Sequence, residues 1–159
     1  MKDIVLQSNI KLCQLDELDE QGRRLVEMAK KATENSYSPY SNFAVGAALR
    51  LADGREMIGA NQENAAFPVG LCAERAAIYA AQSQHPDQPI VAIAIAARNS
   101  KGLMAEPISP CGSCRQVMIE MEQRYSCSIK IYLYGTEGTY VIDSIRDLMP
   151  LSFVDESMK

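Results

Sequence analysis

The sequence lacks two features that would place it in a large class of proteins. It has no basic surplus, because 16 Lys and Arg residues stand against 20 Asp and Glu residues and give a formal net charge of −4. A nucleic-acid-binding surface usually shows a basic patch, so this balance disfavours nucleic acid as a partner and favours a small-molecule ligand. The first residues contain no long apolar segment, so we expect neither a signal peptide nor a membrane-spanning segment.

Internal repeats, low-complexity tracts and linker-like stretches are also missing from the sequence. At 159 residues, 47% of them hydrophobic and 23% charged, the chain has the composition of a globular protein that can bury a sizeable core. We therefore expect a single domain over residues 1–159, with residues 1–15 as a lead-in to which no pattern gives a role.

The chain has five cysteines but a single C-x-x-C pair, formed by Cys111 and Cys114. A structural zinc site with four cysteines usually draws on two such pairs. The alternative of a four-cysteine site therefore needs the isolated Cys13 or Cys127 as its fourth ligand. We interpret these two residues as free thiols, which fits a reducing, cytoplasmic location.

Two short segments carry the chemistry, one reading C-A-E-R and the other P-C-G-S-C-R. Together they supply thiolates from Cys72, Cys111 and Cys114 and a carboxylate from Glu74. Zinc prefers tetrahedral coordination, so three protein ligands leave a fourth position for a water whose pKa the metal lowers. Glu74 can then move protons between the water, a ring nitrogen and a departing ammonia. The combination matches the signature of zinc-dependent nucleobase deaminases that use three cysteines.

Both segments are expected to open a helix. A helix N-terminus presents free backbone N–H groups and a positive dipole end, which favour thiolates. Arg75 is close enough in sequence to donate hydrogen bonds to a thiolate and to offset the negative charge of a three-thiolate site. The alternative, a plain structural or surface role for Arg75, stays open.

Hydrophobic periodicity and turn residues predict the order of the elements. A first helix capped by Asp16 ends near Asn35, and a final short helix capped by Asp143 ends at Met149. The expected strands are residues 43–51, 55–60, 90–97, 128–134 and 139–142, and the expected helices between them are residues 72–82 and 111–123. This alternation favours a mixed sheet with helices on its faces.

From about Tyr37 to Phe153 the chain resembles the small, homotetrameric, zinc-dependent cytidine deaminases. The resemblance rests on P-Y-S-x-F-x-V-G-A-A-L at residues 39–49, on G-x-N-x-E-N-A at residues 59–65, and on the two segments above. It implies an α/β fold, a three-layer α-β-α sandwich with a five-stranded mixed sheet. It also implies hydrolytic deamination of cytidine and deoxycytidine to uridine and deoxyuridine with release of ammonia, as in pyrimidine salvage.

The resemblance implies that Cys72, Cys111 and Cys114 bind one Zn²⁺ ion per subunit and that Glu74 is the proton shuttle. No nucleic-acid or membrane partner is expected; the partner is a nucleoside substrate.

The resemblance also implies substrate contacts. Asn61 and Glu63 are expected to hold the ribose 3′-hydroxyl, Ala73 to contact the substrate, and Phe43 to pack against the pyrimidine face. An amide and a carboxylate two residues apart on an extended segment point the same way and can share one hydroxyl. The alternatives are a turn pair for Asn61 and Glu63 and ordinary core packing for Phe43.

A homotetramer in which neighbouring subunits complete each active site is implied as well. Phe67 and Phe153 are the residues expected to reach across. Phe67 departs from the family, which often has Tyr at this position, and the missing hydroxyl puts a polar role there in doubt. The alternative for Phe153 is that it pins the tail to its own subunit.

Three other functions stay open on the sequence. One is deamination of a modified cytosine nucleoside such as blasticidin S, which the ribose pair disfavours without excluding. Another is a zinc-stabilised assembly protein without activity, for which Glu74 would not be required. The third is deamination of polynucleotides, which would need a groove lined with Lys and Arg.

Overall fold

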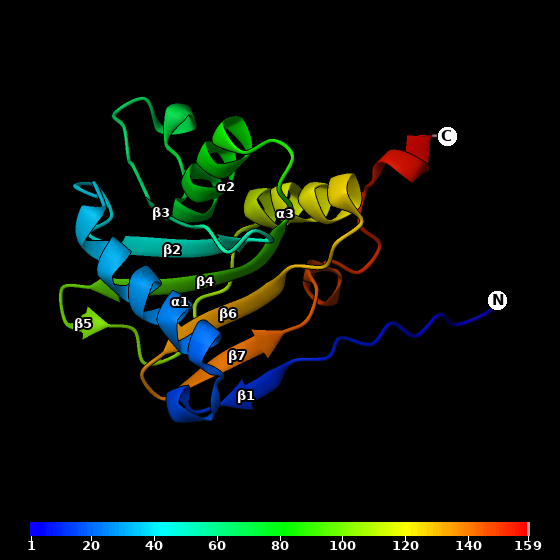
Figure 1. The fold of residues 1–159 in the computed structure, drawn as a ribbon, viewed down its shortest axis with the longest axis horizontal. Coiled ribbons are helices and arrows are strands. Elements are labelled where there is room, and N and C mark those ends of the chain that lie inside the picture. The colour runs from blue at the N-terminus through cyan, green and yellow to red at the C-terminus, as the bar shows by residue number, and fades with distance from the viewer. Residues whose placement is uncertain (159) are drawn as a thin grey trace.

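A computed structural model describes residues 1–158 and shows, within that range, a seven-stranded mixed sheet (Figure 1). The strands are β1 (Lys11–Cys13), β2 (Ala44–Leu51), β3 (Glu56–Ala60), β4 (Ile90–Asn99), β5 (Gly102–Leu103), β6 (Lys130–Gly135) and β7 (Gly138–Ile142). They lie in the order β1-β7-β6-β4-β2-β3, and the two-residue β5 pairs with the end of β4. β4 and β6 run parallel, whereas the other neighbours pair antiparallel.

Helices cover both faces of the sheet, which confirms the three-layer α-β-α prediction (Figure 1). The α-helices are α1 (Glu20–Ala32), α2 (Ala73–Gln84) and α3 (Gly112–Tyr125). The 3₁₀ turns are η1 (Leu15–Glu17), η2 (Thr33–Asn35), η3 (Phe67–Val69), η4 (Ile145–Leu148) and η5 (Asp155–Met158). None of the helices in the described chain is long and apolar enough to cross a membrane.

The central strand β4 shows how the sequence specifies this arrangement. Alternate side chains of a strand point to opposite faces, and β4 is apolar at both sets of positions. Ile93 and Ile95 belong to the core under α2 and α3, whereas Ala94 and Ala96 belong to the core under α1. The continuous apolar run in the sequence is therefore explained by a strand that is buried on both faces.

Two glycines let the helices lie close to the sheet. A Cβ atom on Gly59 of β3 would come 2.4 Å from the carbonyl oxygen of Ala73, at the start of α2. A Cβ atom on Gly46 of β2 would come 2.2 Å from the carbonyl oxygen of Ala29 in α1. Neither distance is compatible with a side chain, so both positions need glycine. Gly59 thereby brings the N-terminus of α2, with its cysteine, against the sheet.

The prediction of five strands was wrong in number. β1 adds a strand at the edge by pairing with β7, and β5 adds a two-residue hairpin arm to β4. Leu12, the central residue of β1, is 65% exposed, so this strand is held by backbone hydrogen bonds and not by a buried apolar face. A strand of that kind carries no alternation of buried and exposed residues by which the sequence could reveal it.

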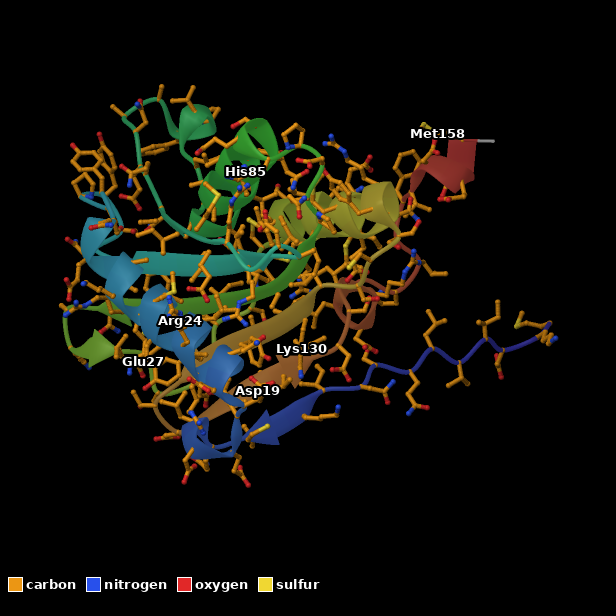
Figure 2. All side chains as sticks on the ribbon, viewed as in Figure 1. Asp19, Arg24, Glu27, His85, Lys130 and Met158 are labelled. Carbon is orange, nitrogen blue, oxygen red and sulfur yellow. The ribbon has the colours of Figure 1, made fainter. Side chains whose placement is uncertain are left out.

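The first helix also starts later than predicted. Asp16 lies within the separate turn η1, and the residue that caps α1 is Asp19, whose carboxylate accepts a hydrogen bond from the backbone N–H of Gly22 at 2.6 Å. Figure 2 labels Asp19 at this end of α1. Asp16 and Asp19 both precede the helix, and aspartate is a preferred cap, so residue type alone could not choose between them.

Candidate metal centre and active site

Three cysteine sulfurs converge where two helices begin. Cys72 and Cys111 are the N-cap residues of α2 and α3, each with extended backbone, and Cys114 lies in the first turn of α3. Their Sγ atoms all lie within 4.8 Å of one another, with 3.8 Å between Cys72 and Cys111 and 3.5 Å between Cys111 and Cys114. Zn–S bonds of about 2.3 Å in a tetrahedron place sulfurs about 3.8 Å apart, so the donor set fits a zinc ion.

The surroundings of these sulfurs favour negative charge. Nη2 of Arg75 donates a hydrogen bond to Sγ of Cys72 at 3.3 Å. The pKa of Cys72 is lowered to about 5, first by a hydrogen bond with the Cys114 thiol and then by Arg75, against the opposing effect of burial. The same hydrogen bond, followed by burial, raises the pKa of Cys114. The Arg75 side chain therefore contacts the sulfur of a candidate zinc ligand, which is the position that a charge-compensating role requires.

Glu74 lies in the first turn of α2, immediately after the cysteine segment, and is 4% exposed. Burial raises the pKa of its carboxyl, and the neighbouring Cys72 raises it further. A buried carboxyl with a raised pKa beside candidate metal ligands is typical of a group that transfers protons in catalysis. The structure thus brings the predicted acid together with the three predicted ligands.

A cavity of about 360 Å³ opens beside Cys72. Its lining residues come from the loop before β2, from the segment between β3 and α2, and from η3. They are Tyr40, Asn61, Gln62, Glu63, Asn64, Phe67, Gly70, Leu71 and Cys72. The cavity therefore contains one predicted zinc ligand and three residues predicted to contact substrate.

The side chain of Asn61 already has several partners. Its Oδ1 accepts hydrogen bonds from Oγ of Ser36 at 2.6 Å and from the backbone N–H of Val45 at 2.8 Å. Its Nδ2 donates to the carbonyl oxygen of Phe43 at 3.0 Å. One amide hydrogen is left over, because the NH₂ group can donate twice. Asn61 consequently holds the loop before β2 in place as well as lining the cavity.

Glu63 fastens the same loop at another point. Its Oε2 accepts hydrogen bonds from the backbone N–H groups of Tyr40, at 2.9 Å, and Ser41, at 3.2 Å, and its Oε1 accepts one from the Ser41 hydroxyl. The Ser41 hydroxyl lowers the pKa of Glu63 most; desolvation opposes this effect, and the backbone N–H groups of Tyr40 and Ser41 add to it. The carboxylate is therefore ionised and keeps acceptor capacity toward the cavity.

The remaining residues predicted to contact substrate differ in their position relative to the cavity. Ala73, fully buried, is the first residue of α2, and Phe67 of η3 is 72% exposed at the cavity. Phe43 is partly buried and, within the described chain, is absent from the cavity lining. Phe153 is 60% exposed, and its carbonyl oxygen accepts a hydrogen bond from Nε2 of Gln116 on α3 at 3.0 Å. The structure thus brings Phe67, but neither Phe43 nor Phe153, to the cavity.

Tyr40 is one of the cavity residues to which the sequence analysis gave no role. Tyr40 lines the cavity, and its ring meets that of Phe67 edge to face, with 5.6 Å between the ring centres. Tyr40 belongs to the P-Y-S motif of the resemblance, but an aromatic residue in a loop gives no sign of the partner it will contact. In the structure, the Tyr40 side chain is 51% exposed and can therefore contact a ligand or another chain.

Comparisons with known proteins point to a single family. The family model of the cytidine and deoxycytidylate deaminase zinc-binding region matches residues 19–129. The chain is 40% identical over 134 residues to a cytidine deaminase of Halalkalibacterium halodurans, covering 84% of this chain and 95% of that protein. It is 38% identical over 135 residues to a cytidine deaminase of Sporosarcina psychrophila, covering 85% and 93% respectively. The crystal structure of cytidine deaminase from Burkholderia pseudomallei superimposes with a TM-score of 0.71 at 38% identity, covering 86% of this chain and all of that one.

Proposed function

Because this chain belongs to the cytidine and deoxycytidylate deaminase family, we propose that it uses the site described above to deaminate cytidine and deoxycytidine to uridine and deoxyuridine. The family makes it a zinc-dependent hydrolase that releases ammonia. The observation that carries the proposal is the buried Glu74 carboxyl, held in the first turn of α2 beside three converging cysteine sulfurs. A purely structural metal site has no use for an acid in that position.

Cys72, Cys111 and Cys114 hold the zinc ion, one per chain. When bound, zinc supplies a Lewis acid that makes a water molecule nucleophilic near neutral pH. The two helix N-termini and the Arg75 guanidinium offset the charge of the three thiolates. Without this compensation, the accumulated negative charge would weaken the metal as a Lewis acid.

Glu74 moves the protons of the reaction. Its carboxylate takes a proton from the attacking water, and its carboxylic acid form returns protons to the ring nitrogen and to the leaving ammonia. Burial and Cys72 raise the pKa of this carboxyl, so it holds a proton more tightly than an exposed glutamate does. One residue can therefore perform all three transfers.

Asn61 and Glu63 bind the ribose 3′-hydroxyl. The second amide hydrogen of Asn61 is available as a donor, and the carboxylate of Glu63 has acceptor capacity beyond its three hydrogen bonds to the loop. Both side chains line the cavity next to Cys72. Ala73 contributes its backbone N–H, which as the first of α2 has no acceptor within the helix. Phe43 lies outside the cavity lining of the described chain and supports the site through its carbonyl oxygen, which accepts a hydrogen bond from Asn61.

The cavity is completed by neighbouring subunits in a homotetramer. Phe67 and Phe153 are 72% and 60% exposed, so each offers an aromatic ring that its own chain does not bury. A nucleoside site buries most of its ligand, and these rings can exclude water from a neighbour's cavity. The enzyme acts in the cytoplasm, where it salvages pyrimidine nucleosides.

One assay separates this function from the alternatives. Purified protein is offered cytidine, deoxycytidine, blasticidin S and single-stranded DNA, and ammonia release is measured together with zinc content. We expect turnover of the first two substrates. Turnover of blasticidin S or single-stranded DNA alone would replace the proposed substrate, and a zinc-loaded protein that releases no ammonia from any of them would overturn the proposal.

A further inference from the structure

The side chain of Arg115 joins the turn that carries Cys111 to a segment that follows the sheet. Its Nε donates a hydrogen bond to the carbonyl oxygen of Pro110 at 2.9 Å, and its Nη1 donates one to the carbonyl oxygen of Leu148 at 2.8 Å. Arg115 lies in α3, whereas both carbonyl groups lie outside that helix. The guanidinium therefore fixes the start of α3 from outside the helical hydrogen-bond ladder.

The carbonyl of Pro110 is the group through which Cys111 can be oriented. The proline ring fixes φ of residue 110, and the hydrogen bond from Arg115 holds the carbonyl that defines its ψ. Together the two restraints set the direction in which the chain enters Cys111, the N-cap of α3. Cys111 is the most exposed of the three cysteines in the metal cluster, so it has little packing of its own to hold it.

Leu148 is a fixed point to which the guanidinium can be anchored. It is the last residue of η4, which packs against α3. The buried carboxylate of Glu122 holds the other end of η4, because Oε1 accepts from the backbone N–H of Ile145 at 3.0 Å and Oε2 from the hydroxyl of Ser144 at 2.7 Å. η4 is thus tied to α3 at both ends, and Arg115 spans from this rigid unit to the cysteine turn.

We infer that Arg115 is a positioning residue for the metal ligand Cys111. The inference rests on the proposed function, because it takes Cys111 to be a zinc ligand. Partners that orient a metal ligand contribute about 10- to 100-fold to metal affinity. A guanidinium is suited to this task because its fixed planar fork reaches two carbonyl groups at once, whereas a lysine ammonium is a single point charge on a flexible stem.

The test compares three variants of the full-length protein. Arg115→Met removes both hydrogen bonds but keeps the aliphatic stem, and Arg115→Lys keeps the charge but not the fork. Arg23→Met is the matched control, because Nη1 of Arg23 also donates to two carbonyl groups, those of Asp16 and Leu18. Both are far in the sequence from the three cysteines of the metal cluster. For each variant we would measure zinc affinity by chelator competition, the absorption spectrum of the cobalt-substituted protein, and thermal unfolding.

We expect Arg115→Met to bind zinc at least about 10-fold more weakly than the native protein and to show a shifted cobalt–thiolate spectrum. The zinc affinity of Arg115→Lys should lie between those of Arg115→Met and the native protein. Arg23→Met should keep the native zinc affinity and cobalt spectrum, even where it lowers the melting temperature. Should Arg115→Met fail to fold, Arg115→Lys carries the test through its own loss of affinity. Arg115 variants that match Arg23→Met in zinc affinity and spectrum would overturn the inference.

A fourth variant separates this inference from the proposed function. Cys111→Ser removes the thiolate itself, so it should lower zinc affinity more than Arg115→Met does. If Cys111→Ser binds zinc as the native protein does, the proposed ligand set is wrong. If Cys111→Ser loses zinc while the Arg115 variants do not, the ligand set stands and only the positioning role of Arg115 is wrong.

Discussion

The metal centre and the rim of the cavity beside it are built in contrasting ways. At the metal centre, Glu74 is 4% exposed, the sulfurs converge at two helix ends, and Arg75 contacts Cys72. At the rim, Phe67 is 72% exposed, and its described ring contact is with Tyr40, itself half exposed. One chain therefore completes the chemical half of the site but leaves the substrate-covering half open, which is the arrangement expected if a second chain closes it.

The largest predicted effect is a loss of turnover from a substitution at the metal centre alone. Glu74→Gln keeps the shape of the side chain but cannot carry protons, so we expect turnover of cytidine to fall by at least about 10²- to 10⁴-fold. Zinc content should stay at the native level, because Glu74 is not a ligand. Uridine formation and zinc content are measured on the same sample, and near-native turnover with full zinc would remove Glu74 from the mechanism.

A smaller loss of activity is expected from substitutions in the cavity lining next to the metal centre. Asn61→Ala and Glu63→Ala should each lower kcat/KM for cytidine by the equivalent of about 1–3 kcal/mol, because a substrate hydroxyl is left unpaired. Both should retain zinc. Since both side chains also hold the loop before β2, thermal unfolding is measured in parallel.

Free cytosine serves as the control for these two variants, because it has no ribose. The native protein should use cytosine poorly, and the variants should lose activity on cytidine without losing the remaining activity on cytosine. Equal efficiency of the native enzyme on cytosine and cytidine would show that Asn61 and Glu63 serve structure alone.

The smallest effect lies outside the site and tests whether the site is independent of general stability. Glu56 on β3 accepts hydrogen bonds from Arg50 at 2.6 Å and from Arg24 at 2.7 Å; Figure 2 labels Arg24 on α1. Glu56→Gln should lower the free energy of unfolding by about 1 kcal/mol and leave zinc content and kcat unchanged. A clear loss of zinc or kcat would mean that the metal centre depends on the charge contacts that Glu56 makes with Arg50 and Arg24.

The stability that Glu56 contributes to the native protein should depend on pH. Burial opposes ionisation of Glu56, but the hydrogen bonds and charges of Arg50 and Arg24 outweigh it and leave the pKa below its usual 4.5. A carboxyl with a lowered pKa contributes stability that is present above its unfolded pKa and is lost as the pH falls through the folded pKa. Stability of the native protein should therefore decline more steeply below about pH 4.5 than that of Glu56→Gln.

The sequence predicted the metal centre better than the rim for a physical reason. The metal ligands and Glu74 belong to short motifs whose spacing is dictated by one helix turn, so local sequence is enough to place them. The hydrogen bonds of Asn61 to Ser36 and Val45 link positions far apart in the chain, so the local sequence does not predict them. The same holds for the contact between Tyr40 and Phe67.

The fold shows the same division between local and long-range information. The helices and central strands follow from apolar periodicity, and their predicted positions agree with the structure to within a few residues. The edge strand β1 was not predicted, because its pairing with β7 depends on backbone hydrogen bonds between residues far apart in the chain. Its side chains are also largely exposed, so they show no apolar pattern. Asp19 was passed over as the cap of α1 because Asp16, three residues earlier, satisfies the same local rule.

The central claim is that one chain completes the chemistry while another covers the substrate, and subunit mixing tests it most directly. Glu74→Ala chains and Phe153→Ala chains are prepared separately, each with low activity, and are then mixed under conditions in which subunits exchange. Mixed assemblies contain some sites with an intact Glu74 that are covered by an intact Phe153 from another chain. The account predicts cytidine deamination above the mean of the two parents; no recovery despite demonstrated exchange, or a fully active monomer, would contradict it.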